Sequence, residues 1–114
     1  KGSNPYTEHY SAVMAEVPDP ADMSTQINTK LIETLKEADV VPVAGEAGSH
    51  CLANTVRDIA NQFGDDAFVR KLILIEDATS PVGNFERQQD EFIQEMVGRG
   101  MQLTTTDKFD PRKI

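Results

Sequence analysis

The residue best suited to chemistry is Cys51, the single cysteine of this 114-residue chain. It follows a turn of small residues over 45–50, which comes directly after a short apolar run. A buried lone cysteine is usually an inert small hydrophobe. A cysteine that opens a helix differs, because the helix dipole and the unpaired backbone N–H groups favour the thiolate. The same N–H groups could hold a carbonyl oxygen that becomes negative during attack. The pattern therefore points to a nucleophile and an oxyanion site within one turn.

The two histidines, His9 and His50, are weaker candidates. His50 is adjacent to Cys51, and neighbours on a helix do not face each other, so lining of a pocket is favoured over a Cys–His dyad. His9 is expected in a loop. One cysteine and two histidines cannot build a closed zinc site from this chain alone. A single cysteine also cannot form an internal disulfide, which fits a reducing cytoplasm.

Alternating helices and strands are expected to position Cys51. A loop over about the first twenty residues ends at the prolines 18 and 20, which disfavour helix just before them. The elements expected after it are a helix from Asp22 or Ser24 to about residue 38, a strand over 40–44, a helix from Cys51 ended by Gly64, a strand over 71–76, a helix from about Phe85 ended by Gly98 or Gly100, and a strand over 101–106. Pro42 is awkward in the first strand because it removes one ladder donor.

This alternation predicts an α/β fold with a mostly parallel sheet covered by helices, and its active site lies beyond the carboxyl ends of the strands. The turn before Cys51 is such a place. Two apolar stripes are expected in the core, namely Ile27/Leu31/Leu35 and Phe85/Phe92/Met96. The helix-surface carboxylates Glu91 and Glu95 are expected on a solvated face.

Composition excludes several partners. Hydrophobic residues make up 39% of the chain, enough for a core, and 11 basic against 19 acidic residues give a net charge of −8. That charge repels a phosphate backbone, so nucleic acid is not an expected partner. Neither a signal peptide nor an apolar run of about 20 residues is found, so no membrane partner is expected.

Three stretches of the sequence resemble one family. The run 45–58, Gly-Glu-Ala-Gly-Ser-His-Cys-Leu-Ala-Asn-Thr-Val-Arg-Asp, is similar to the nucleophile segment of the nicotinamidase group within the isochorismatase-like hydrolases. That segment reads Gly-x-Ala-x-x-x-Cys-Val and continues as a helix with Thr and Asp. Upstream, Lys1-Gly2 and Tyr10-Ser11 resemble the family's Lys-Gly loop and Tyr-Ser motif, and 77–80 fits as well. The resemblance covers nearly the whole chain.

The resemblance implies a role for several residues. Cys51 would be the nucleophile, and Lys1 the catalytic lysine whose ammonium helps to hold the thiolate and the transition-state charge. A cis peptide bond would join Glu46 to Ala47. The backbone N–H groups of Ala47 and Cys51 would form the oxyanion hole.

The resemblance also implies a fold and a missing part. Tyr10 and His50 match positions that approach the substrate pocket. The expected fold is three-layer α/β/α, Rossmann-like, of which residues 1–114 would be only the C-terminal half of a single domain. The family's catalytic Asp and its Asp/His metal ligands have no counterpart here. The missing N-terminal half is therefore expected to supply the general base and a divalent, zinc-like ion, and this chain alone is expected to be inactive. Gly48 stands where the family commonly has Thr.

The activity implied is a cysteine amidohydrolase that converts nicotinamide to nicotinate and ammonia through a thioester, in NAD metabolism, in a cytoplasmic homo-oligomer. Another small amide or ureido substrate remains open, whereas isochorismatases proper typically lack this cysteine. An alternative function of a different class is that of a nucleotide- or phosphate-binding module, which would use the glycine turn over 45–48. That turn lacks Gly-x-Gly-x-x-Gly and Gly-Lys-Ser/Thr, so the signal is weak. A catalytically silent fragment is the fourth alternative.

Overall fold

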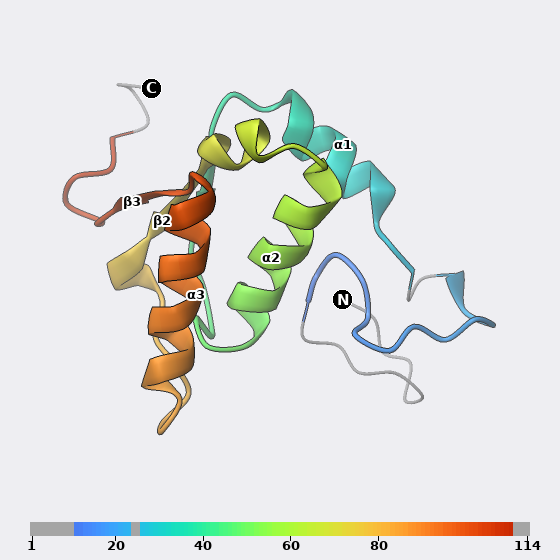
Figure 1. The fold of residues 1–114 in the computed structure, drawn as a ribbon, viewed down its shortest axis with the longest axis horizontal. Coiled ribbons are helices and arrows are strands. Elements are labelled where there is room, and N and C mark those ends of the chain that lie inside the picture. The colour runs from blue at the N-terminus through green and yellow to red at the C-terminus, as the bar shows by residue number, and fades with distance from the viewer. Residues whose placement is uncertain (1–10, 24–25, 111–114) are drawn as a thin grey trace.

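The computed structural model describes residues 11–23 and 26–110, which form an α/β fold built on a small parallel sheet (Figure 1). The elements in chain order are α1 (Thr29–Glu37), β1 (Val41–Val43), α2 (Cys51–Phe63), the 3₁₀ helix η2 (Asp66–Lys71), β2 (Leu72–Ile75), the 3₁₀ helix η3 (Glu76–Ala78), α3 (Glu86–Arg99) and β3 (Gln102–Thr104). The predicted alternation of helices and strands is confirmed. The strands are shorter than the sequence pattern suggests.

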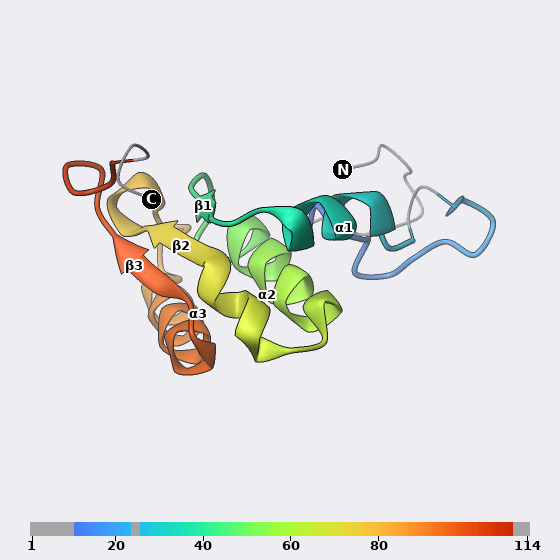
Figure 2. The same ribbon diagram turned by 90° about the horizontal axis from the view of Figure 1, so that it is seen from above.

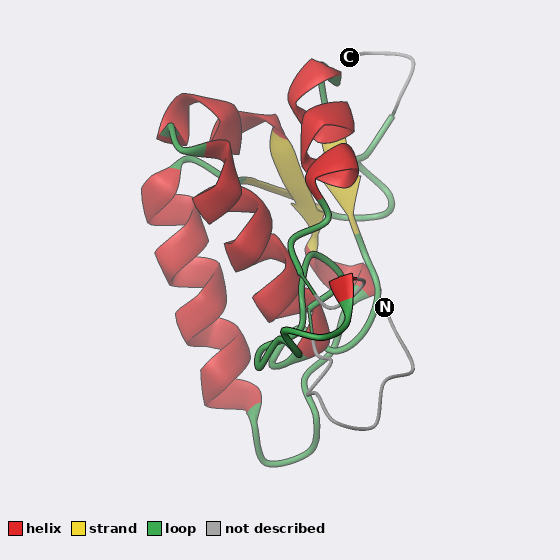
Figure 3. Cartoon of the chain, turned by 90° about the vertical axis from the view of Figure 1, so that its right-hand side faces the viewer, coloured by secondary structure: helices red, strands yellow, loops and turns green. Residues whose placement is uncertain are grey.

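The sheet has the order β1-β2-β3, and each strand pairs with the next in parallel. Val41 lies opposite Leu72, and Ile73 lies opposite Gln102. The helices α2 and α3 connect successive strands and lie on the same side of the sheet, as right-handed crossovers require (Figures 2 and 3). The predicted parallel sheet with helical cover is therefore confirmed in this coarse form. β1 is an edge strand within the described residues, and an edge tolerates Pro42.

The core lies between the sheet and the helices α2 and α3. Leu72 and Leu74 are fully buried and alternate along β2 with the partly buried Ile73 and Ile75. Phe92 and Met96 of α3 are also fully buried. The inner face of α2 adds Leu52, Ala53, Val56, Ile59, Ala60 and Phe63. The prediction of Phe92 and Met96 as core is confirmed.

Two predictions about apolar stripes are wrong in part. Ile27 precedes α1 and is 38% exposed, because the helix begins at Thr29 rather than near Asp22. The side chain of Asn28 accepts a hydrogen bond from Leu31 N–H at 3.1 Å and so caps α1. Ile32 is the buried residue of that helix. Phe85 is likewise 38% exposed, because it is the N-cap of α3 and lies outside the helical repeat.

Glycines end both long helices. Gly64 after α2 has φ 74°, and Gly100 after α3 has φ 119°. This left-handed backbone is open to glycine without steric cost, which confirms Gly64 as the end of one helix and selects Gly100 over Gly98 for the other.

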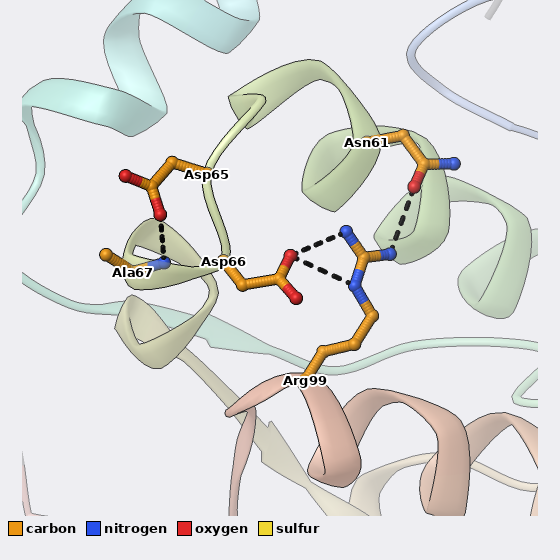
Figure 4. A network of polar contacts seen from close by, with 5 residues as sticks. All are labelled: Asn61, Asp65, Asp66, Ala67 and Arg99. Atoms are coloured by element: carbon orange, nitrogen blue, oxygen red, sulfur yellow. Dashed lines mark hydrogen bonds and ion pairs between the residues drawn. The ribbon is translucent and has the colours of Figure 1, made fainter.

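Arg99, the last residue of α3, contacts two other elements of the fold (Figure 4). Its guanidinium donates to Asp66 Oδ1 at 3.0 and 3.2 Å and to Asn61 Oδ1 at 3.0 Å. Asp66 opens η2 and Asn61 lies in the last turn of α2. Asp65 caps η2 by accepting from Ala67 N–H at 2.8 Å. One planar fork therefore fixes the junctions of α2, η2 and α3.

Across residues 11–23 and 26–110, no helix combines the length and the apolar composition that crossing a bilayer requires.

Candidate active site

Cys51 is the first residue of α2 and follows the carboxyl end of β1 by eight positions, 43 to 51. Its side chain is partly exposed. It borders a cavity of about 310 Å³ whose other lining residues are Ala12, Val43, Ala44, Gly45, Glu46, Leu52, Thr55, Val56 and Ile59. Cys51 therefore borders open, mostly apolar space and is not wholly enclosed in the core. A partly exposed cysteine at a helix start is the setting in which thiols become reactive.

The turn before Cys51 is folded by its own backbone. The carbonyl oxygen of Ala47 accepts hydrogen bonds from His50 N–H and Leu52 N–H, both at 3.0 Å. The peptide bond between Glu46 and Ala47 is cis, at the position where the family resemblance places one. Within the described part of the chain, Ala47 N–H has no hydrogen-bond acceptor. None of the described residues therefore occupies this donor, which lies four residues before Cys51 in the same turn.

The loop after β2 makes hydrogen bonds to this turn. Gly45 N–H donates to Ala78 O and Gly48 N–H donates to Ser80 O, both at 3.0 Å. Val82 N–H donates to the buried hydroxyl of Ser49 at 2.9 Å. The loops that leave β1 and β2 lie at the carboxyl ends of neighbouring parallel strands, which is why residues so distant in sequence meet here (Figure 1).

Glu46 adds a side-chain link between the same two loops. Its Oε2 accepts from Ser80 N–H at 3.3 Å and from the Ser80 hydroxyl at 2.8 Å. The resemblance gives Glu46 only as one partner in the cis peptide bond. Sequence reasoning missed Ser80, because no local pattern joins residues 34 positions apart.

His50 contacts residues outside the cavity that contains Cys51. Its Nδ1 lies 2.7 Å from Ser49 Oγ, and its ring meets the ring of Phe85 edge to face at 4.8 Å between centroids. Aromatic pairs favour this T-shaped arrangement because the ring edge is positive and the face negative. The expected part of His50 in lining the substrate pocket stays a prediction.

Gly48 lies against α3, and a larger residue there would require the end of the Gln89 side chain to shift. A Cβ on Gly48 would fall in the space of the Gln89 amide oxygen and 2.9 Å from Thr79 Oγ1. Both of those oxygens are buried and lack a hydrogen-bond partner among the described residues.

Thr55 connects Cys51 to the segment that precedes α1. One turn after the cysteine, its hydroxyl donates to Cys51 O at 2.7 Å and accepts from Ala12 N–H at 2.9 Å. Ala12 thereby becomes part of the cavity wall. The adjacent Ser11 is buried and accepts from Val13 N–H at 3.0 Å. The i, i+4 spacing of Cys51 and Thr55 was the only local signal for this role.

Asp77 ties the loop after β2 to the loop after β3. Its carboxylate accepts from the Thr106 hydroxyl and from Thr106 N–H, both at 2.8 Å. These hydrogen bonds, first that of the side chain and then that of the backbone, lower the pKa of Asp77 below the ordinary 3.8. Asp77 lies outside the lining of the cavity and so has a structural part.

Lys1, His9 and Tyr10 fall outside the described residues, so the expected lysine and tyrosine of the site have no position here. In the ranges 11–23 and 26–110, no three His, Cys, Asp or Glu side chains converge on a point where a metal ion could bind. Of the predicted site residues, Glu46 and Cys51 border one cavity, and Ala47 lies between them in the turn but outside the lining of that cavity.

Comparisons of the chain with protein-family models, with curated proteins and with solved structures find no significant match.

Proposed function

We propose that this chain carries the nucleophile of a cysteine amidohydrolase, with nicotinamide as the first substrate to test. The observation that carries the proposal is the position of Cys51. It opens α2 at the carboxyl end of a parallel strand, and it borders a cavity of about 310 Å³. The cis peptide bond at Glu46–Ala47 and the available Ala47 N–H support the same interpretation. Other small amides and ureido compounds remain alternative substrates.

The proposed reaction is a two-step acyl transfer. A carboxylate outside this chain takes the thiol proton, and Cys51 Sγ bonds to the amide carbonyl carbon. The negative oxygen is held by the N–H groups of Ala47 and Cys51, a type of interaction that is commonly worth about 3–4 kcal/mol per donor. The C–N bond then breaks as the proton passes to the leaving ammonia. Water attacks the thioester, which releases the carboxylic acid and restores the thiol.

The proposal includes parts that this chain does not contain. The resemblance implies that residues 1–114 are the C-terminal part of a three-layer α/β/α domain and that a preceding part supplies the catalytic Asp. The described side chains form no group that fits a divalent ion, so no step above uses one. We infer that the isolated chain is inactive. Assembly as a homo-oligomer and a cytoplasmic location stay predictions.

The alternative of a phosphate-binding module is less well supported by the turn. A phosphate cradle needs several backbone N–H groups aimed at one anion. Here the N–H groups of Gly45 and Gly48 donate to Ala78 and Ser80, and those of His50 and Leu52 donate to Ala47. These four donors are already engaged, which favours the acyl-transfer interpretation.

The test is made on the complete protein that includes this chain. Ammonia release from nicotinamide is measured for the wild type, for Cys51→Ala and for Gln88→Ala, an exposed control on α3. We expect Cys51→Ala to abolish turnover and the control to keep it. Labelling with iodoacetamide, mapped to Cys51 by mass spectrometry, should inactivate the enzyme in step with modification. Undiminished deamidation by the labelled protein would falsify the proposal.

A further inference from the structure

The exposed carboxylate of Glu46 makes two hydrogen bonds to a single residue of the neighbouring loop. Both the backbone N–H and the hydroxyl of Ser80 donate to the same oxygen, Oε2, at 3.3 and 2.8 Å. A free surface glutamate samples many rotamers, and pinning such a side chain costs conformational entropy. Two donors on one acceptor oxygen select one conformation of the side chain, and a neutral amide oxygen at the same reach could accept both hydrogen bonds.

Glu46 directly precedes Ala47, so the contact of Glu46 with Ser80 can affect the orientation of Ala47 N–H. Glu46 contributes the carbonyl carbon, and Ala47 the nitrogen, of one peptide group, so the plane that carries Ala47 N–H begins at Glu46. On either side, Gly45 N–H and Gly48 N–H are bound to Ala78 O and Ser80 O. The backbone hydrogen bonds thus fix the ends of the turn, and the Glu46 carboxylate fixes its middle. Glu46 also borders the cavity that contains Cys51.

We propose that Glu46 is a positioning residue for the amidohydrolase reaction: anchored on Ser80, it aims Ala47 N–H at the substrate carbonyl oxygen. This inference rests on the proposed function. Glu46 takes up or delivers no proton in this role. Its carboxylate matters as an acceptor at the right reach, because a donor displaced by about 1 Å can cost about a hundredfold in rate.

Three substitutions at Glu46 separate the effect of the distance between the acceptor oxygen and the backbone from the effect of the negative charge. Glu46→Gln removes the charge but keeps an oxygen at the same distance from the backbone. Glu46→Asp keeps the charge but draws the oxygens back by one methylene. Glu46→Ala removes both. Glu33→Ala, an exposed glutamate on α1, is the matched control. The readouts on the complete protein are kcat, KM, Tm and the rate at which iodoacetamide labels Cys51.

A positioning role predicts a specific ranking. Glu46→Ala and Glu46→Asp should lower kcat about tenfold to a hundredfold, as misplacement of one oxyanion donor does, while KM and Tm stay close to wild type. Glu46→Gln should stay within about threefold of wild type, and Glu33→Ala should be unchanged. Labelling of Cys51 should slow in Glu46→Ala and Glu46→Asp only, because the same turn sets the position of Cys51 at the start of α2.

Other outcomes overturn the inference. Wild-type kcat in Glu46→Asp together with a loss in Glu46→Gln would show that charge, not reach, is what matters. Equal kcat in all variants would show that the contact with Ser80 has no catalytic consequence. A drop in Tm that parallels the drop in kcat would show a merely structural role. If the wild type deamidates no substrate, the proposed function fails, and the labelling rates alone decide whether Glu46 holds the turn.

Discussion

The amide oxygen of Gln89 on α3 lies 2.2 Å from the point where a Cβ on Gly48 would be. Gly48 has no positive φ, so the cost of a larger residue there would be steric. The contact joins the turn over residues 45–50 to α3, the helix that follows β2.

Gly48→Ala should therefore destabilise the protein. The inserted methyl group requires the amide end of Gln89 to move, and a displaced rotamer of such a flexible side chain costs on the order of 1 kcal/mol. Removal of the obstructing side chain in Gly48→Ala/Gln89→Ala should recover most of that loss, and the recovery is a coupling energy that a double-mutant cycle of urea unfolding measures.

Gly98→Ala is the matched control for that cycle. Gly98 lies within α3, and nothing lies within 4 Å of the point where its Cβ would be. Alanine there should be neutral or stabilising by up to about 1 kcal/mol, because glycine is unfavourable in a helix interior. An equal cost at positions 48 and 98 would contradict the steric argument.

The sequence predicted those elements whose determinants are local. The apolar run before η3 and the glycines 64 and 100 at helix ends are signals that a few neighbouring residues supply. The predicted start of α1 was wrong because the true start depends partly on residues distant in sequence. Asn28 caps the helix and also donates its N–H to Val13 O at 2.7 Å. Phe85 was misassigned because helical spacing alone cannot separate an N-cap from the first buried turn.

The candidate site also has parts that local sequence predicts and parts that it does not. Cys51 could be identified from the small residues before it, since a strand-to-helix turn needs them. The contacts of Glu46 with Ser80 and of Gly48 with Gln89 could not, because they join loops and helices that meet only when parallel strands are in register. Local patterns thus predict where Cys51 lies, whereas tertiary contacts hold the turn that precedes it.

Thr55→Val should disturb the site more than the fold. The variant loses the hydroxyl that joins Cys51 O to Ala12 N–H but keeps the volume of the side chain. We expect a loss of about 1 kcal/mol in unfolding free energy, typical for one hydrogen-bonding side chain, and a fall in kcat because Ala12 lines the cavity. Thr55→Ser, which keeps the hydroxyl, should retain turnover. If Thr55→Val matches the wild type in kcat, the segment around Ala12 has no part in the site.

Asp77→Asn should change how stability depends on pH. Because Thr106 lowers the pKa of Asp77 in the folded state, the ionised carboxylate stabilises the fold at pH values above the ordinary 3.8. This contribution disappears as the pH falls through the lowered pKa, where the folded protein also binds the proton. The variant should therefore have a lower Tm than the wild type at neutral pH, and the gap should close under acid conditions. A Tm difference that stays constant from neutral to acid pH would rule out the linkage.

Arg99→Lys tests whether the fork geometry at the junction of α2, η2 and α3 matters beyond the charge. Lysine keeps the cation but cannot reach Asp66 and Asn61 together, as the planar guanidinium does at 3.0–3.2 Å (Figure 4). The side chain of Arg99 is 26% exposed, so solvent screens part of the interaction, and a loss of about 1 kcal/mol in unfolding free energy is expected.

Arg87→Lys is the control, because the pair of Arg87 with Glu91 is largely exposed within one helix and should be worth about 0.3–0.5 kcal/mol at most. Neither variant should alter kcat, since neither arginine lines the cavity of Cys51. Equal losses in the two variants would mean that the bridge from Arg99 to two elements contributes no more than a surface ion pair.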